Sequence, residues 1–167
     1  MRTGTRLTVC AALLALPAVV MAQGDATFAT RNLTVDTALV AAQAALKKCR
    51  DSGWQAAVAV VDRSGVVQVL LRDRYAGPHT PRTASGKAWT AVSFRSNTGA
   101  LVELTQPGKP QSGLRSLPRA VILGGGMIIE GGGQMLGAIG VSGAPGGEAD
   151  ELCAKAGIAA IQESLDF

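Results

Sequence analysis

Apolar and polar positions in the first half of the chain predict a helix followed by a β-hairpin. Over Leu33–Cys49 apolar side chains recur at helical spacing after Thr34, a favourable N-cap, so this segment is predicted to be a helix. The run Trp54–Asp62 is short and rich in valine, which is typical of a buried strand. A tight turn at residues 63–65 leads into a second predicted strand, Val66–Arg72, and the two strands should pair antiparallel.

A second helix is predicted to start at Thr80 and Pro81. The hydroxyl of Thr80 can cap the first turn. Proline is favourable at the first helical position, because the N–H that it lacks would have no partner within the helix there. The helical pattern continues to Phe94 or Arg95.

The remainder of the chain is predicted to contain a short helix, a loop, several strands and a last helix. The short helix covers Gly99–Leu104 with Thr98 as its cap, and three prolines and two glycines in Gln106–Pro118 predict a loop. Two glycine triplets interrupt an apolar region. The first, at residues 124–126, predicts a bulge or a close backbone approach, and the second, at residues 131–133, predicts a hairpin turn. The predicted strands and last helix are Ala120–Leu123, Met127–Glu130, Gln134–Val141 and Glu148–Ser164.

Together these elements predict one α+β domain. Short connections favour antiparallel pairing, so we expect an antiparallel sheet of about five strands flanked by helices. The expected order is helix, strand, strand, helix, short helix, two or three strands, helix.

The first 22 residues have the pattern of a secretory signal peptide. Two arginines precede the apolar run Leu7–Ala22, which ends in a small-x-small cleavage site. An uncleaved membrane anchor is the alternative, but the run has 16 residues and contains Pro17, whereas a spanning helix needs ~20 apolar residues. We expect residues 1–22 to be removed, residues 23–167 to form the domain, and the mature protein to be periplasmic or secreted without membrane attachment.

Composition and charge exclude several classes of protein. Hydrophobic residues make up 47% and charged residues 17%, which permits a packed core and excludes a disordered chain. Aromatic residues are only 4%, and removal of Arg2 and Arg6 lowers the formal charge from +4 to +2. Without aromatic platforms or a basic block, we expect no nucleic-acid partner.

Cys49 and Cys153 are the cysteines that remain after cleavage. Outside the cytoplasm an even pair is compatible with one disulfide. The alternative is two small buried side chains, because free cysteine is among the most buried residue types. The sequence leaves both interpretations open.

Several catalytic motifs are incomplete. Gly86-Lys87 is followed by Ala88 and lacks the upstream glycine of a phosphate-binding loop. The run from Gly140 to Ala144 falls one residue short of a nucleophile elbow. A single histidine supplies too few imidazole ligands to indicate a zinc site of ordinary composition. Hydrolase, kinase and dehydrogenase functions are therefore not indicated.

His79 is the candidate for chemistry. It precedes the predicted helix start, where the positive end of the helix dipole favours an uncharged ring whose nitrogen can bind iron. Arg82 and Lys87 follow closely and, with the helix N-terminus, can receive a carboxylate. An iron porphyrin offers both an iron and propionates. The ordinary alternative is a solvated or turn-capping histidine.

Five stretches carry a further signal: Val60–Gly65, Ala76–Thr80, Gly86–Ala91, Gly137–Gly143 and Ala144–Glu151. In sequence and in order along the chain they resemble the GlcG/HbpS family of haem-binding proteins. The resemblance implies a profilin-like antiparallel sheet, export, and assembly as a dimer or higher oligomer. It also implies haem binding, with haem degradation or redox sensing as associated roles. Some relatives accompany glycolate or propanediol metabolism, where a corrinoid is the alternative ligand. A second hypothesis, from the residues themselves, is a binder or catalyst for a small organic acid, with the N-terminus of the helix at Thr80 and the backbone amides of Gly124–Gly126 as the anion site.

The resemblance also suggests roles for single residues. His79 matches a position that is often histidine, Thr98 falls where a haem-linked threonine is expected, and Lys87 can pair with a propionate or be a solvated helix lysine. The E-x-x-E iron-binding pattern of some members is replaced by Arg82 and Ser85, so surface iron binding is not expected.

Overall fold

The computed structural model describes residues 26–165 of the chain. Residues 31–165 belong to one compact unit, which holds all the helices and strands described below. The predicted signal peptide, residues 1–22, lies outside the described residues.

Four strands form one antiparallel sheet. Valine-rich β1 (Ala57–Asp62) is central, with β2 (Val67–Arg72) on one side and β4 (Gln134–Ser142) on the other; β3 (Gly126–Gly131) pairs with β4. Both faces of the sheet are covered, so side chains pointing either way from β1 are buried.

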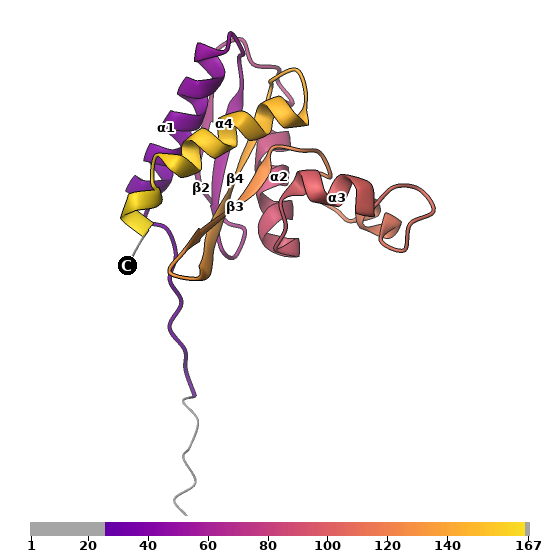
Figure 1. Cartoon of the computed structure of the whole chain (residues 1–167), viewed down its shortest axis with the longest axis horizontal. Coiled ribbons are helices and arrows are strands. Elements are labelled where there is room, and N and C mark those ends of the chain that lie inside the picture. Colours follow the sequence, from indigo (N-terminus) through magenta and orange to yellow (C-terminus); the bar gives the residue numbers. More distant parts are fainter. Residues whose placement is uncertain (1–25, 166–167) are drawn as a thin grey trace, which may run out of the picture. The chain divides into compact units, whose positions relative to one another are not determined.

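Helices cover the two faces of the sheet (Figure 1). The helices α1 (Val35–Asp51) and α4 (Gly147–Ala159) pack on one face, and α2 (Thr80–Phe94) packs on the other. The short helix α3 (Thr98–Leu104) follows α2. None of the helices in residues 26–165 is long and apolar enough to cross a membrane. The α+β class, the antiparallel sheet and the hairpin of β1 and β2 are confirmed.

The helix α2 packs unusually closely on β4. A Cβ atom at Gly140 would occupy the space of the Ala84 carbonyl oxygen and lie 2.7 Å from the Ala88 nitrogen. Glycine at this position therefore allows the helix backbone to contact the strand backbone directly. This contact sets the distance between α2 and the sheet.

The sheet has four strands, so the expectation of about five was one strand too many. Ala120–Leu123 lies outside the sheet, and the N–H of Val121 donates to Thr90 Oγ1 at 2.9 Å instead of to a strand. Gly125, with φ of 112°, then turns the backbone before β3 begins. The first glycine triplet thus marks a close approach, with Gly126 against the Lys87 backbone.

Two further details of the prediction were wrong. Thr80 does not cap α2: the N-cap is His79, and Thr80 Oγ1 donates to the Gly77 carbonyl at 2.8 Å. The last helix ends at Ala159 and is followed by a 3₁₀ turn, Gln162–Leu165, rather than running on to residue 164. A second 3₁₀ turn lies in the predicted loop, at Ser112–Ser116.

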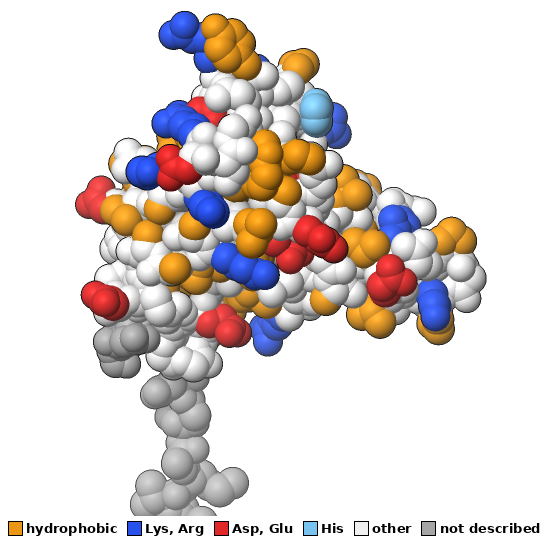
Figure 2. Space-filling model, turned by 45° about the horizontal axis from the view of Figure 1, so that its top comes forward, with side chains coloured by type: hydrophobic (Ala, Val, Ile, Leu, Met, Phe, Trp, Pro, Cys, Tyr) orange, Lys and Arg blue, Asp and Glu red, His pale blue; other side chains and the backbone are white. Residues whose placement is uncertain are grey.

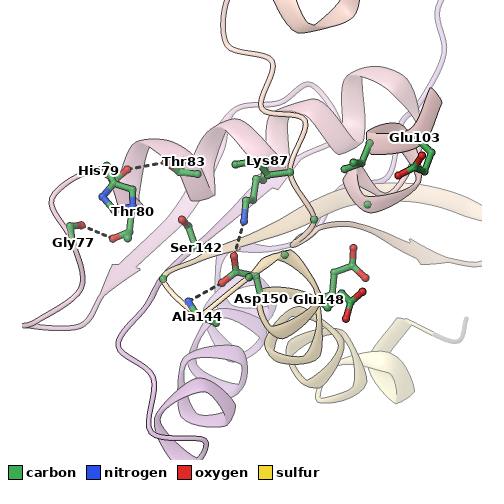
Figure 3. A pocket seen from close by; sticks show the side chains of 18 residues that line it. Gly77, His79, Thr80, Thr83, Lys87, Glu103, Ser142, Ala144, Glu148 and Asp150 are labelled. Carbon is green, nitrogen blue, oxygen red and sulfur yellow. Dashed lines mark hydrogen bonds and ion pairs between the residues drawn. The ribbon is translucent and has the colours of Figure 1, made fainter. Parts of the chain in front are cut away.

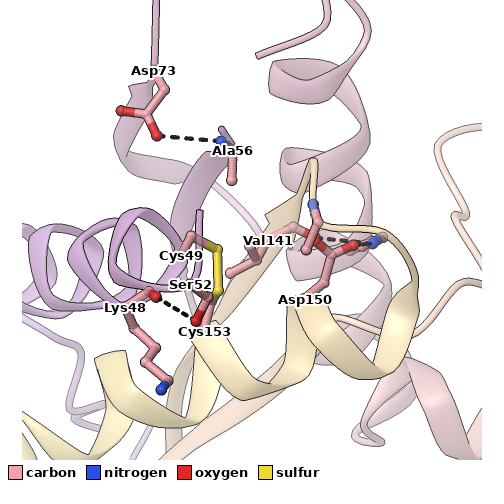
Figure 4. The surroundings of a disulfide bond; sticks show 10 residues. Lys48, Cys49, Ser52, Ala56, Asp73, Val141, Asp150 and Cys153 are labelled. Carbon is pink, nitrogen blue, oxygen red and sulfur yellow. Dashed lines mark hydrogen bonds and ion pairs between the residues drawn. A yellow bond between two sulfur atoms is a disulfide. The ribbon is translucent and has the colours of Figure 1, made fainter. Parts of the chain in front are cut away.

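A disulfide joins Cys49 in α1 to Cys153 in α4, with a Cα–Cα distance of 5.4 Å (Figure 4). Both residues are fully buried, and they link segments 104 residues apart in the sequence. The bond ties together the two helices that cover one face of the sheet.

Candidate functional site

A cavity of about 820 Å³ lies where α2, α3, the start of α4 and the end of β4 meet. Its lining comes from segments far apart in the sequence, including the loop before α2 and the loop after β4 (Figure 3). Gly124 of the first glycine triplet also lines it. On α2 the lining residues are Thr80, Thr83 and Lys87, which share one helix face through their spacing of three and four. Ligand pockets have volumes of roughly 300–1,000 Å³, so this cavity is large enough for a cofactor.

His79 lies at one end of this cavity, with its side chain exposed on the surface (Figure 2). The imidazole packs over Gly77, where a Cβ atom would lie 2.7 Å from Cε1. The loop is fixed by Thr80, whose N–H and hydroxyl both donate to the Gly77 carbonyl, at 3.0 and 2.8 Å. The side chain of His79 makes no capping hydrogen bond to α2. The ring is thus positioned by backbone contacts while its nitrogens stay available.

Lys87 and Asp150 form a buried ion pair beside the cavity, with 2.6 Å between Nζ and Oδ2. The two side chains are only 3% and 5% exposed. Lys87 Nζ also donates to the Val141 carbonyl at 2.9 Å, and Asp150 Oδ1 accepts from the Ala144 N–H at 3.0 Å. The pair therefore connects α2, α4, β4 and the loop between them. The alternative of a solvated helix lysine at position 87 is wrong, because burial removes Lys87 from water.

Burial raises the pKa of the Asp150 carboxyl above its ordinary value of 3.8. The hydrogen bond and positive charge of Lys87, followed by backbone donors at Ala144 and Gly143, lower the pKa and oppose this effect. Loss of hydration is the stronger influence, as expected for a carboxylate with little access to water.

Three further carboxylates line the cavity opposite His79. They are Glu103 on α3, and Glu148 and Glu151 on the first turns of α4. Because the charges of Lys87 and Asp150 offset each other, these glutamates give that end of the cavity a negative charge. This negative end of the cavity was not predicted from the sequence, where its local signal is the cluster of acidic residues from Glu148 to Glu151.

Thr98 does not line the cavity but forms hydrogen bonds to the segment that does. The side chain is fully buried, and Oγ1 donates to the Leu123 carbonyl at 2.6 Å while accepting from the Gly126 N–H at 2.8 Å. These bonds hold Leu123 and Gly124, both of which line the cavity. Thr98 belongs to α3, and the residue at the N-cap is Asn97, so Thr98 is not a cap.

Arg82 faces a different cavity, which it shares with Arg119. The structure thus brings His79 and Lys87 to one cavity, places Thr98 behind its wall, and separates Arg82 from it. No group of three or more His, Cys, Asp or Glu side chains that could hold a metal ion occurs among the described residues.

Comparison with known proteins gives consistent matches. The family model for haem-degrading HbpS-like proteins matches residues 33–159. A doubly substituted HbpS from Streptomyces reticuli is 36% identical, with a TM-score of 0.76 over 87% of this chain and 97% of that one. A haem complex of PduOC is 31% identical, with a TM-score of 0.74 over 78% of this chain and 95% of that one.

A longer protein also matches. The corrinoid adenosyltransferase PduO of Citrobacter freundii is 33% identical over 121 residues, or 71% of this chain. The chain spans only 36% of the length of that relative.

Proposed function

The chain belongs to the HbpS-like family, and from that premise we propose that it binds haem in the cavity between α2, α3 and α4, with His79 as the iron ligand. The observation that carries the proposal is the position of the one imidazole in the chain, at the edge of a cavity of about 820 Å³. The PduOC relative, which is similar over 95% of its own length, was solved as a haem complex.

The residues present fit such a group. A histidine ring nitrogen is a common axial ligand of haem iron, and among the described residues no hydrogen bond engages the ring of His79. Val102, Leu123 and Ala144 supply apolar surface for the macrocycle. The bound haem would supply an iron centre for redox or ligand chemistry.

The remaining lining residues would set orientation and charge. Lys87 and Asp150 neutralise each other, so they supply a rigid polar wall rather than a net charge. Glu103, Glu148 and Glu151 would repel the haem propionates, so these groups are expected at the other end of the cavity. We propose a binding role, with haem degradation or redox sensing as associated activities of the bound complex.

A corrinoid is the second candidate ligand, supported by the 33% identity to PduO. A small organic acid is supported less well. The Gly126 N–H already donates to Thr98, the Thr80 N–H already donates to Gly77, and Pro81 has no N–H. These positions at the helix start and in the first glycine triplet therefore offer no free backbone donor, and the glutamates add repulsion.

Titration of the protein with hemin, followed at the Soret band, tests the proposal. We expect a saturable spectral shift in the unaltered chain and at least about tenfold weaker binding in His79→Ala, because the iron loses its ligand. Arg63→Gln, in the turn between β1 and β2, is the control and should bind like the unaltered chain.

Parallel titrations separate the alternatives. A shift no larger than that of an unrelated protein would reject haem binding. Saturable binding of cobalamin without hemin binding would favour the corrinoid role, and thermal stabilisation by hydroxy or keto acids alone would favour the small-acid role.

We further propose that the protein is exported and acts as a homo-oligomer. Export is supported by the pattern of residues 1–22 and by the Cys49–Cys153 disulfide, which is typical of oxidising compartments. The intact mass of protein from the periplasm should correspond to cleavage after Ala22, and light scattering should give a mass above that of one chain. Full-length protein retained in the cytoplasm, or a monomer, would contradict the respective proposal.

A further inference from the structure

A second cavity lies on another face of α2, away from the haem site proposed above. It has a volume of about 400 Å³ and is lined by Arg82, Ser85, Gly86, Arg119, Ala120 and Val121. The lining residues include two arginines and no acidic residue. Its charge is therefore opposite to that of the glutamate end of the first cavity.

Arg119 is held in place by its backbone and by an aromatic ring. It lies in the turn Leu117–Ala120, which is closed by a hydrogen bond from the Ala120 N–H to the Leu117 carbonyl at 3.2 Å. Its φ of 73° is the left-handed conformation that normally favours glycine. The guanidinium stacks over Trp89, with 5.0 Å from Cζ to the ring centroid. Arg119 thus combines an unfavourable backbone conformation with a guanidinium that contacts an aromatic ring.

Neither guanidinium is matched by a negative charge. Within residues 26–165 the ion pairs are Lys47–Asp51, Arg50–Asp73 and Lys87–Asp150, and none includes Arg82 or Arg119. No hydrogen bond of the described residues engages either guanidinium. Two exposed arginines that line one cavity and have no acidic partner can receive the oxygens of an external anion.

We propose that this cavity binds a small oxyanion, with carboxylate or phosphate oxygens held by Arg82 and Arg119. The guanidinium group presents paired N–H donors that match the two oxygens of either anion. Gly86 leaves space for this arrangement, because the segment with Arg119 and Val121 packs directly against it: a Cβ atom there would lie 2.5 Å from Val121 Cγ2. This inference is independent of haem binding.

Nuclear magnetic resonance of the indole N–H groups tests the proposal, because the chain has two tryptophans. Trp89 contacts Arg119 and reports on the cavity, and Trp54, which precedes β1, is the internal reference. The ¹⁵N-labelled protein is titrated separately with sodium phosphate and sodium acetate, with sodium chloride at equal ionic strength as the control. We expect a saturable shift of the Trp89 resonance with phosphate, acetate or both, and none with chloride.

Variants assign the effect to the two arginines. Arg82→Gln is expected to weaken binding about tenfold or more, and Arg119→Gln to abolish the saturable response. Arg95→Gln is the matched control, because Arg95 also has a positive φ, of 48°, but does not line the cavity. A response to phosphate alone or to acetate alone would define the oxyanion. Equal responses to chloride, silence with both anions, or equal losses in all three variants would overturn the proposal.

Discussion

The Lys87–Asp150 pair is the residue-scale feature on which the candidate site depends. Removing two charges from water is unfavourable, and the pair offsets this with a 2.6 Å contact and two further hydrogen bonds to the backbone. Removal of either partner would therefore leave the charge of the other buried without compensation. The pair connects the cavity wall on α2 with the wall on α4, so its loss would affect both stability and the shape of the cavity.

Replacing Lys87 with methionine should lower the free energy of unfolding by about 3–5 kcal/mol at neutral pH, because Asp150 is left buried without its partner. Urea denaturation measures this change. Lys155→Met, which removes an exposed lysine on α4, should change stability by less than about 0.5 kcal/mol. Similar losses in the two variants would show that the ion pair makes no special contribution.

The raised pKa of Asp150 predicts a pH dependence of stability. Between 3.8 and the higher pKa of the folded state, the folded chain binds this proton more often than the unfolded chain. The contribution of Asp150 to stability is therefore greatest below pH 3.8 and falls as the pH rises through the folded-state pKa. The carbon resonance of the carboxyl should titrate above 3.8 in the folded protein.

Asp150→Asn lacks this titration and serves as the comparison. The unfolding free energy of the unaltered chain minus that of the variant should decrease as the pH rises from 3.8 through the folded-state pKa of Asp150. A difference that increases with pH would contradict the expected direction.

Local sequence signals identified some of these residues but not their partners. His79 and Lys87 were candidates because they flank a recognisable helix start, and both line the cavity. The partnership of Lys87 with Asp150 spans 63 positions and could not be found from local spacing. Thr98 looked like a cap in sequence, but its hydroxyl bonds to Leu123 and Gly126, which only the tertiary fold brings near.

At the scale of elements, the direct contact of α2 with β4 sets the position of three cavity-lining side chains. Thr80, Thr83 and Lys87 lie on the same helix as Ala84, whose carbonyl contacts Gly140. A displacement of α2 away from the sheet would therefore move all three side chains together.

Gly140→Ala should force this displacement, because the added Cβ atom overlaps backbone atoms that cannot move aside individually. We expect a loss of about 1–3 kcal/mol or more in unfolding free energy, together with weaker hemin binding. Gly113→Ala is the control, since a Cβ atom there meets no other atom within 4 Å. Equal stability of the two variants would contradict the role of this contact.

Periodicity predicted most elements because it depends only on neighbouring residues. The segments of α1, α2, β1 and β2 were placed to within a few residues for this reason. Ala120–Leu123 has the composition of a strand, yet Thr90 takes the hydrogen bond of Val121 and Gly125 turns the chain away from the sheet. These tertiary contacts have no local signature.

At the scale of the whole molecule, the Cys49–Cys153 disulfide restricts the unfolded chain more than any local contact. It closes a loop between residues 104 positions apart, and long loops lose the most conformational entropy. The sequence left the pairing open, because only the packing of α1 on α4 brings the two cysteines together.

Replacing both cysteines with alanine should lower the free energy of unfolding by about 2–5 kcal/mol, measured by denaturation against the oxidised chain. Both positions are changed at once so that no unpaired buried thiol remains. Peptide mapping without reduction should recover Cys49 and Cys153 as one linked species. Free alkylated cysteines at both positions, with unchanged stability in the double variant, would contradict the bond.

The same disulfide makes the two sides of the cavity between α2, α3 and α4 mechanically unequal. Glu148, Asp150 and Glu151 form one side on the first turns of α4, and Cys153 fastens that helix covalently to α1 directly afterwards. Gly99, Val102 and Glu103 form the other side on α3, a seven-residue helix that leads into the long 105–118 segment. A wide, flat ligand that needs more space should displace α3, while the side of the cavity on α4 stays in place.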